Sequence, residues 1–149
     1  MAGSLEVVVA DDTLIVRQGL LAILDAIDHV VVVAECGDHD SLVAAVDEHR
    51  PGVVLTDVCM PPTMTDEGIR AARHVRETYP EIGVVVLSQF SEPEYVLSLF
   101  DDGSERLGYL LKEQVGDPAD LSRALRTVAD GGPVVDPRIV DGLLTARRG

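Results

Sequence analysis

The stretch Val53-Val54-Leu55-Thr56-Asp57-Val58-Cys59-Met60-Pro61-Pro62 decides how this sequence folds. It begins as a short run of apolar, β-branched residues, which is typical of a strand buried on both faces of a parallel sheet. The prolines that follow mark a turn, so Asp57 lies where the strand ends. Because open α/β sheets bind ligands at the carboxyl ends of their strands, Asp57 is either a functional carboxylate or an ordinary turn residue.

Length and charge restrict the class of protein. The 149 residues, 46% of them hydrophobic, fit one domain with a core of its own. No apolar run is long enough to cross a bilayer and the N-terminus lacks a signal-peptide pattern, so we expect a soluble cytoplasmic protein without membrane contact. A net charge of −14 argues against direct nucleic-acid binding by these residues, because phosphate backbones would be repelled.

Strand and helix patterns alternate along the chain. Apolar, β-branched runs predict five strands, over residues 5–10, 29–34, 53–56, 82–87 and 107–111. Helical spacing and capping residues predict helices over about 13–27, 40–50, 65–79, 91–102 and 117–130, and a short sixth helix from Asp136-Pro137 onward. Alternation of this kind requires right-handed crossovers. The sequence therefore predicts an α/β fold, a doubly wound five-stranded parallel sheet with helices on both faces.

Polar side chains follow the apolar strands at the points where the strands end: Asp11, Asp12, Asp57, Ser88 and Lys112. In a parallel sheet these positions meet at one edge, which would collect three carboxylates, a hydroxyl and an ammonium group. Crowded carboxylates need a cation, and Mg²⁺ accepts carboxylates while sharing its other positions with phosphate oxygens. We therefore expect Asp11 and Asp12 to hold Mg²⁺ and Asp57 to be the nucleophile that accepts a phosphoryl group. Ser88 and Lys112 would then neutralise the phosphoryl oxygens.

The motifs around these residues resemble the receiver domain of two-component response regulators. The matching segments are Val9-Ala10-Asp11-Asp12, Thr56-Asp57-Val58-Cys59-Met60-Pro61, Val86-Leu87-Ser88 and Gly108-Tyr109-Leu110-Leu111-Lys112. The resemblance implies a CheY-like, flavodoxin-like sheet with the strand order 2-1-3-4-5. It also implies that Asp57 receives its phosphoryl group from a sensor histidine kinase, and that the backbone carbonyl of Cys59 joins Asp11, Asp12 and Asp57 around Mg²⁺.

The same resemblance assigns a switch. Ser88 and Tyr109 would form it, the hydroxyl moving to the phosphoryl group and the ring turning inward behind it. From the residues alone, Tyr109 can equally be an ordinary core residue. Gln89 would tune the lifetime of the phosphoryl group by shielding it from water, unless it is an ordinary loop residue. The chain would catalyse only its own phosphorylation and autodephosphorylation and would not otherwise be an enzyme.

The Gly-Tyr-Leu-Leu-Lys string and the Gly132–Pro137 segment look most like the NarL/LuxR-type subfamily. This resemblance implies a receiver domain over residues 1–131, with 132–149 a short helical extension or linker toward a helix-turn-helix output domain outside this chain. Phosphorylation would promote homodimerisation, and DNA would be bound through that output domain, which controls transcription. The apolar stripe Ile139, Val140, Leu143 and Leu144 would pack on its own domain, contribute to a dimer face or dock the output domain.

Other classes of function stay open at this point. A stand-alone receiver could act as a phosphotransfer or protein-interaction module. A Mg²⁺-dependent phosphatase using an aspartyl-phosphate is a further alternative, although Cys59 occupies the position where such enzymes carry a second acid. A nucleotide-binding module would need a Gly-x-Gly-x-x-Gly motif after the first strand, and the sequence has none there.

Overall fold

The computed structural model describes residues 4–58, 67–88, 100, 103–112 and 115–136. The strands are β1 (Leu5–Ala10), β2 (Val30–Cys36), β3 (Val53–Asp57), β4 (Gly83–Ser88), β5 (Leu107–Leu111) and β6 (Val134–Val135). The helices are α1 (Leu14–Asp25), α2 (His39–His49), α3 (Glu67–Thr78) and α5 (Pro118–Ala129). Apart from Phe100, the helix predicted over 91–102 lies outside the described residues, and so do the helix predicted after Asp136-Pro137, Cys59 and Gln89.

Six strands of the described part form one parallel sheet in the order β2-β1-β3-β4-β5-β6. The α/β class and the order 2-1-3-4-5 are confirmed, and β6 adds a strand that was not predicted. Its two residues are too few to show a period, and the following Asp136-Pro137 suggested the start of a helix. The role of residues 132–149 as an extension or linker stays a prediction.

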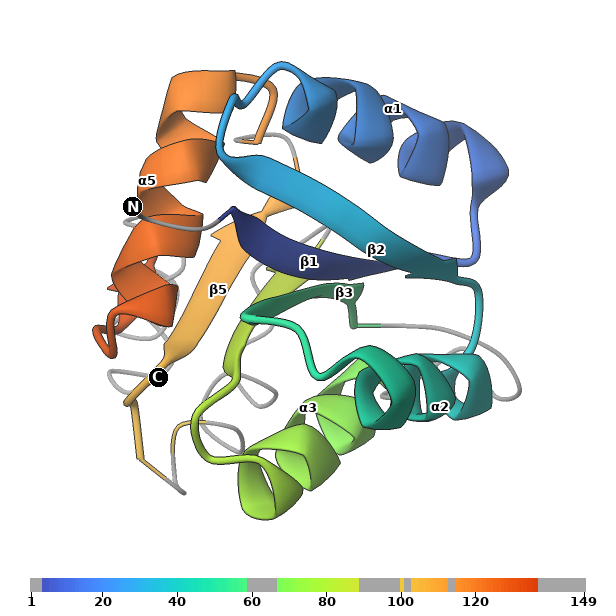
Figure 1. The fold of residues 1–149 in the computed structure, drawn as a ribbon, viewed down its shortest axis with the longest axis vertical. Helices are drawn as coiled ribbons and strands as arrows, with labels where there is room; N and C mark the ends of the chain where they lie inside the picture. Colours follow the sequence, from blue (N-terminus) through green and yellow to red (C-terminus); the bar gives the residue numbers. More distant parts are fainter. Residues whose placement is uncertain (1–3, 59–66, 89–99, 101–102, 113–114, 137–149) are drawn as a thin grey trace, which may run out of the picture.

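Two hydrophobic cores lie on opposite faces of the sheet, one under α1 and α5 and the other under α2 and α3 (Figure 1). Successive strand residues point to opposite faces, so β1 supplies both cores. Val7 and Val9 join the core under α1 and α5, and Val8 joins the other. This double coverage explains why β3 and β4 consist of buried residues from end to end.

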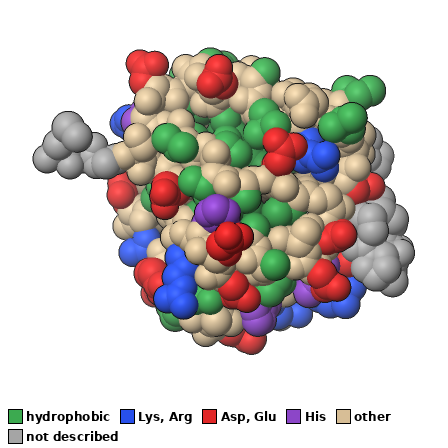
Figure 2. All heavy atoms as spheres, turned by 45° about the vertical axis from the view of Figure 1, so that its right-hand side comes forward, with side chains coloured by type: hydrophobic (Ala, Val, Ile, Leu, Met, Phe, Trp, Pro, Cys, Tyr) green, Lys and Arg blue, Asp and Glu red, His purple; other side chains and the backbone are tan. Residues whose placement is uncertain are grey.

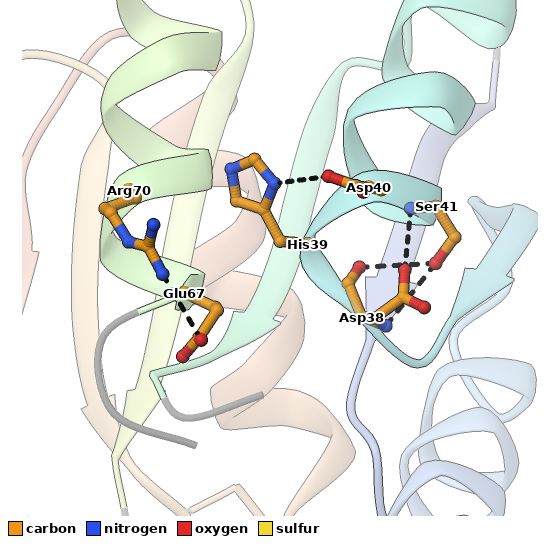
Figure 3. Close-up of polar contacts among 6 residues, drawn as sticks. All are labelled: Asp38, His39, Asp40, Ser41, Glu67 and Arg70. Carbon is orange, nitrogen blue, oxygen red and sulfur yellow. Dashed lines mark hydrogen bonds and ion pairs between the residues drawn. The ribbon is translucent and has the colours of Figure 1, made fainter. Parts of the chain in front are cut away.

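Helix boundaries follow from capping residues. Asp38 begins α2 one or two residues before the predicted start, because its Oδ1 accepts a hydrogen bond from Ser41 N at 2.7 Å and the Ser41 side chain faces the Asp38 backbone in return (Figure 3). The two residues form a capping box. Asp117 caps α5 as predicted, accepting from Ala119 N at 2.9 Å, with Pro118 in the first turn.

The surface agrees with the acidic composition. Figure 2 shows acidic side chains spread over one face of the molecule, with hydrophobic groups between them and fewer basic ones. Across the described residues, each helix is too short or too polar to cross a lipid bilayer.

Candidate functional site

The polar residues predicted to meet do lie along one edge of the sheet. Asp11 directly follows β1, Asp57 and Ser88 are the last residues of β3 and β4, and Lys112 directly follows β5. The first three are buried, with exposed fractions of 0% for Asp11, 7% for Asp57 and 1% for Ser88. A charged residue is rarely buried so fully unless a partner compensates its charge. The partners at this edge therefore decide what the site can do.

The three carboxylates form a tight group. One oxygen from each of Asp11, Asp12 and Asp57 lies within 4.8 Å of the others. The Lys112 ammonium bridges two of them, because its Nζ lies 3.2 Å from Asp11 Oδ2 and 3.0 Å from Asp57 Oδ2. Three negative charges thus share one positive charge, and the site as a whole carries an excess of negative charge.

The pKa shifts reflect this imbalance. Burial raises the pKa of Asp57; the Lys112 ammonium opposes the rise and the neighbouring Asp11 adds to it. For Lys112, burial alone would lower the pKa, but Asp57 and Asp11 together outweigh burial and raise it. The ammonium is therefore held in its charged form, while the ionised form of Asp57 is disfavoured by its surroundings. A further cation would relieve that cost.

The donor set fits Mg²⁺. Asp11 Oδ1 accepts a hydrogen bond from Thr13 N at 2.8 Å, which orients the carboxylate. Asp11 Oδ2 is fully buried, and among the described residues its polar contact is the Lys112 ammonium, 3.2 Å away. A buried carboxylate oxygen with spare coordination, beside two further carboxylates, is the arrangement that a hard divalent cation uses. The carbonyl of Cys59 lies outside the described residues.

Ser88 and Tyr109 lie on neighbouring strands. In the register of β4 and β5, Val86 pairs with Tyr109 and Ser88 pairs with Leu111. Because residues two apart share a face, Ser88 and Tyr109 are diagonal neighbours on the face covered by α2 and α3. The Tyr109 ring is fully buried in that core. This placement is compatible with the predicted switch, whose movement stays a prediction.

Gly68, in the first turn of α3, packs against the end of β3 and was not among the predicted site residues. Its N–H donates to Val58 O at 2.8 Å, and a Cβ at this position would lie 1.7 Å from Asp57 O. Any side chain there would push α3 away from the end of β3. The available signal was a glycine in the first turn of a predicted helix, since glycine disfavours helix and needs a reason to be there.

Comparisons with known proteins agree with this geometry. Residues 7–126 match the family "Response regulator receiver domain". The chain belongs to that family. A two-component response regulator of the LuxR family is among the similar solved structures, which supports the predicted NarL/LuxR-type subfamily.

Two curated relatives illustrate the likeness. Oxygen regulatory protein NreC of Staphylococcus epidermidis is 33% identical over 140 residues, which cover 94% of this chain and 62% of NreC. Transcriptional regulatory protein DegU of Brevibacillus brevis is 33% identical over 144 residues, which cover 97% of this chain and 58% of DegU. The chain therefore spans about three-fifths of the length of these relatives.

Solved structures give the same picture. A two-component response regulator of the LuxR family from Aurantimonas sp. SI85-9A1 superposes with a TM-score of 0.83 at 26% identity, covering 99% of this chain and 100% of that one. The isolated receiver domain of RcsB from Salmonella enterica serovar Typhimurium, solved in the presence of the phosphomimetic BeF3-, superposes with a TM-score of 0.77 at 27% identity. That match covers 93% of this chain and 98% of the other.

Proposed function

We propose that this chain is the phosphorylatable receiver of a transcriptional response regulator. Asp57 accepts a phosphoryl group from a sensor histidine kinase, and the reaction depends on Mg²⁺. The chain catalyses only the gain and loss of its own phosphoryl group. The observation that carries the proposal is the group of three carboxylates, within 4.8 Å of one another, against a single ammonium.

The chemistry is a transfer between two protein side chains. A carboxylate oxygen of Asp57 forms a bond to phosphorus while the bond from phosphorus to the kinase histidine nitrogen breaks. Asp11, Asp12 and Asp57, with the carbonyl of Cys59, would hold Mg²⁺, which supplies positive charge for the phosphoryl oxygens. Lys112, already 3.0 Å from Asp57 Oδ2, pairs with the phosphoryl group once it is attached. Such positioning of charge is the main source of catalysis in phosphoryl transfer.

The response to phosphorylation follows from the neighbours of the site. The Ser88 hydroxyl donates to a phosphoryl oxygen, and Tyr109 moves behind it. This rearrangement shifts a pre-existing equilibrium of the face formed by the fourth predicted helix, β5 and α5. The readout is homodimerisation and DNA binding through an output domain. Two observations support it: DegU is named a transcriptional regulatory protein, and RcsB has been solved as dimers bound to DNA.

Intact-mass spectrometry tests the proposal. The chain is incubated with acetyl phosphate and Mg²⁺, and the wild type gains the mass of one phosphoryl group. Asp57→Asn gains none, because the amide cannot act as the acceptor, and EDTA prevents the gain in the wild type. Asp120→Asn makes the same chemical change at an exposed position on α5 and labels like the wild type. Labelling of Asp57→Asn, or labelling that ignores EDTA, would overturn the proposal.

A further inference from the structure

Arg17, in the first turns of α1, reaches back to the end of β1. Its Nη1 donates to the main-chain carbonyl oxygen of Asp11 at 2.8 Å. Its Nε donates to Glu35 Oε1 in β2 at 3.1 Å. With 19% of its side chain exposed, Arg17 connects α1, β1 and β2 beside the acidic group.

The carbonyl that Arg17 holds belongs to the peptide between Asp11 and Asp12. Asp11 N donates to Cys36 O at 3.0 Å, and that bond ties the near side of Asp11 to β2. Because a peptide unit is planar, fixing its carbonyl also fixes the direction in which the chain enters Asp12. Asp12 lies beyond the end of β1, so strand pairing no longer holds the chain there. The bond from Arg17 to Asp11 O holds the peptide that leads into Asp12, and the bond from Thr13 N to Asp11 Oδ1 holds the carboxylate.

The charge of Arg17 is compensated locally. A guanidinium beside the carboxylates would compete with a divalent cation, but the Glu35 carboxylate neutralises it at 3.1 Å. Arg17 therefore contributes geometry to the acidic group and little net charge. Because Arg17 adds little net charge, replacing it should change cation affinity mainly through the position of the carboxylates, and so should lower that affinity.

We propose that Arg17 is a positioning residue for the cation site. By holding the Asp11–Asp12 peptide it sets the spacing of the two carboxylates that receive a divalent cation. The inference rests on the proposed function, because it presupposes that the acidic group binds such a cation. Groups that orient metal ligands from outside the coordination shell commonly change affinity ten- to hundredfold when removed.

Binding of Mn²⁺, followed by the electron paramagnetic resonance signal of the free ion, tests the inference on the full chain. Arg17→Met is expected to raise the Kd for Mn²⁺ about tenfold or more. Arg17→Lys keeps the charge but lacks the planar guanidinium that reaches two acceptors. Its Kd for Mn²⁺ should therefore lie between that of the wild type and that of Arg17→Met. Arg123→Met removes one positive charge from an exposed site on α5 and leaves the Kd within about twofold, since exposed charges are strongly screened.

The sign of the effect separates positioning from simple charge. Loss of a cation beside the site would tighten Mn²⁺ binding if charge alone mattered, whereas loss of positioning weakens it. Saturating Mg²⁺ should restore the acetyl phosphate labelling rate of Arg17→Met, which a general folding defect would prevent. Unchanged or tighter Mn²⁺ binding by folded Arg17→Met overturns the inference. Should that variant fail to fold, an unchanged Kd in Arg17→Lys overturns it instead.

The same Mn²⁺ measurement distinguishes a failure of the proposed function from a failure of the role of Arg17. A wild-type chain that binds no Mn²⁺ overturns the cation site itself, and the positioning role with it. A wild type that binds Mn²⁺, together with an Arg17→Met variant of equal affinity, overturns only the role of Arg17.

Discussion

Basic side chains do different work at the two edges of the sheet. At the amino edge, Arg76 Nη2 donates to Gly103 O at 2.8 Å and to Glu105 O at 3.2 Å, and Arg106 Nη1 donates to Ala129 O at the end of α5. These guanidinium groups bind main-chain carbonyls of the loop before β5 and of the last residue of α5. At the carboxyl edge Arg17 also donates to a main-chain carbonyl, Asp11 O, but Lys112 lies against two carboxylates.

The difference is one of charge balance. A guanidinium bound to neutral carbonyls keeps its charge partly in solvent and closes a loop at modest gain. An ammonium among three carboxylates leaves a buried net negative charge, which costs stability until a cation arrives. Among the described residues, the carboxyl edge therefore carries an unbalanced negative charge that a cation would offset, whereas the guanidinium contacts at the amino edge are to neutral carbonyls.

Lys112→Met should break this balance with the largest effect. It leaves Asp11 and Asp57 buried without their common counterion, and removal of one partner from a buried ion pair costs about 3 kcal/mol. We expect that loss in the free energy of unfolding, measured by urea denaturation in EDTA. Mg²⁺ should recover part of it, because a ligand that binds the native state stabilises it. Equal stability of variant and wild type in EDTA would contradict the charge imbalance.

Arg76→Met probes the opposite edge. Loss of the bonds to Gly103 O and Glu105 O should lower the free energy of unfolding by about 1.5 kcal/mol. The loss should be the same with Mg²⁺ and with EDTA, since Arg76 lies at the far ends of the strands. Urea denaturation under both conditions measures it. A loss that Mg²⁺ reverses would show that the two edges are coupled and would remove the contrast between them.

Asp38→Ala sharpens the comparison, because Asp38 also lies near the carboxyl end of β2 but has hydrogen-bond donors of its own. The Ser41 hydroxyl and N–H lower the pKa of Asp38, so its capping contribution is present above the ordinary aspartate pKa and is lost as pH falls through the lowered value. At pH 7 we expect a loss of about 1 kcal/mol in urea denaturation.

The acidic range provides the check on this last variant. The stabilities of wild type and Asp38→Ala should converge below the lowered pKa of Asp38, because the protonated acid no longer attracts the helix N-terminus. Asp38→Asn is the matched control, since asparagine caps about as well as aspartate and does not titrate. A gap between wild type and Asp38→Ala that is as wide in acid as at pH 7 would assign the effect to something other than the carboxylate.

Much of this molecule could be predicted from its sequence, because the apolar runs that identify the strands also locate the polar residues of the site. Buried parallel strands are continuous apolar runs, so the first polar residue after each run lies at one edge, and this alone brings Asp11, Asp57 and Lys112 together. The role of Arg17 escaped prediction because its acceptor at the site, Asp11 O, is a main-chain carbonyl, and every residue type has one. Gly68 and the two-residue β6 were not predicted either, because neither a close backbone contact nor so short a strand produces a periodic pattern of hydrophobic residues.

Strand β6 is the edge strand of the sheet, next to β5. Val135 pairs with Tyr109, and Asp136 N donates to Tyr109 O at 3.0 Å. Tyr109, whose ring lies in the core, and Asp136, which directly follows β6, thus share a hydrogen bond. A displacement of the Tyr109 main chain must therefore also move Asp136, because the hydrogen bond joins the two residues directly.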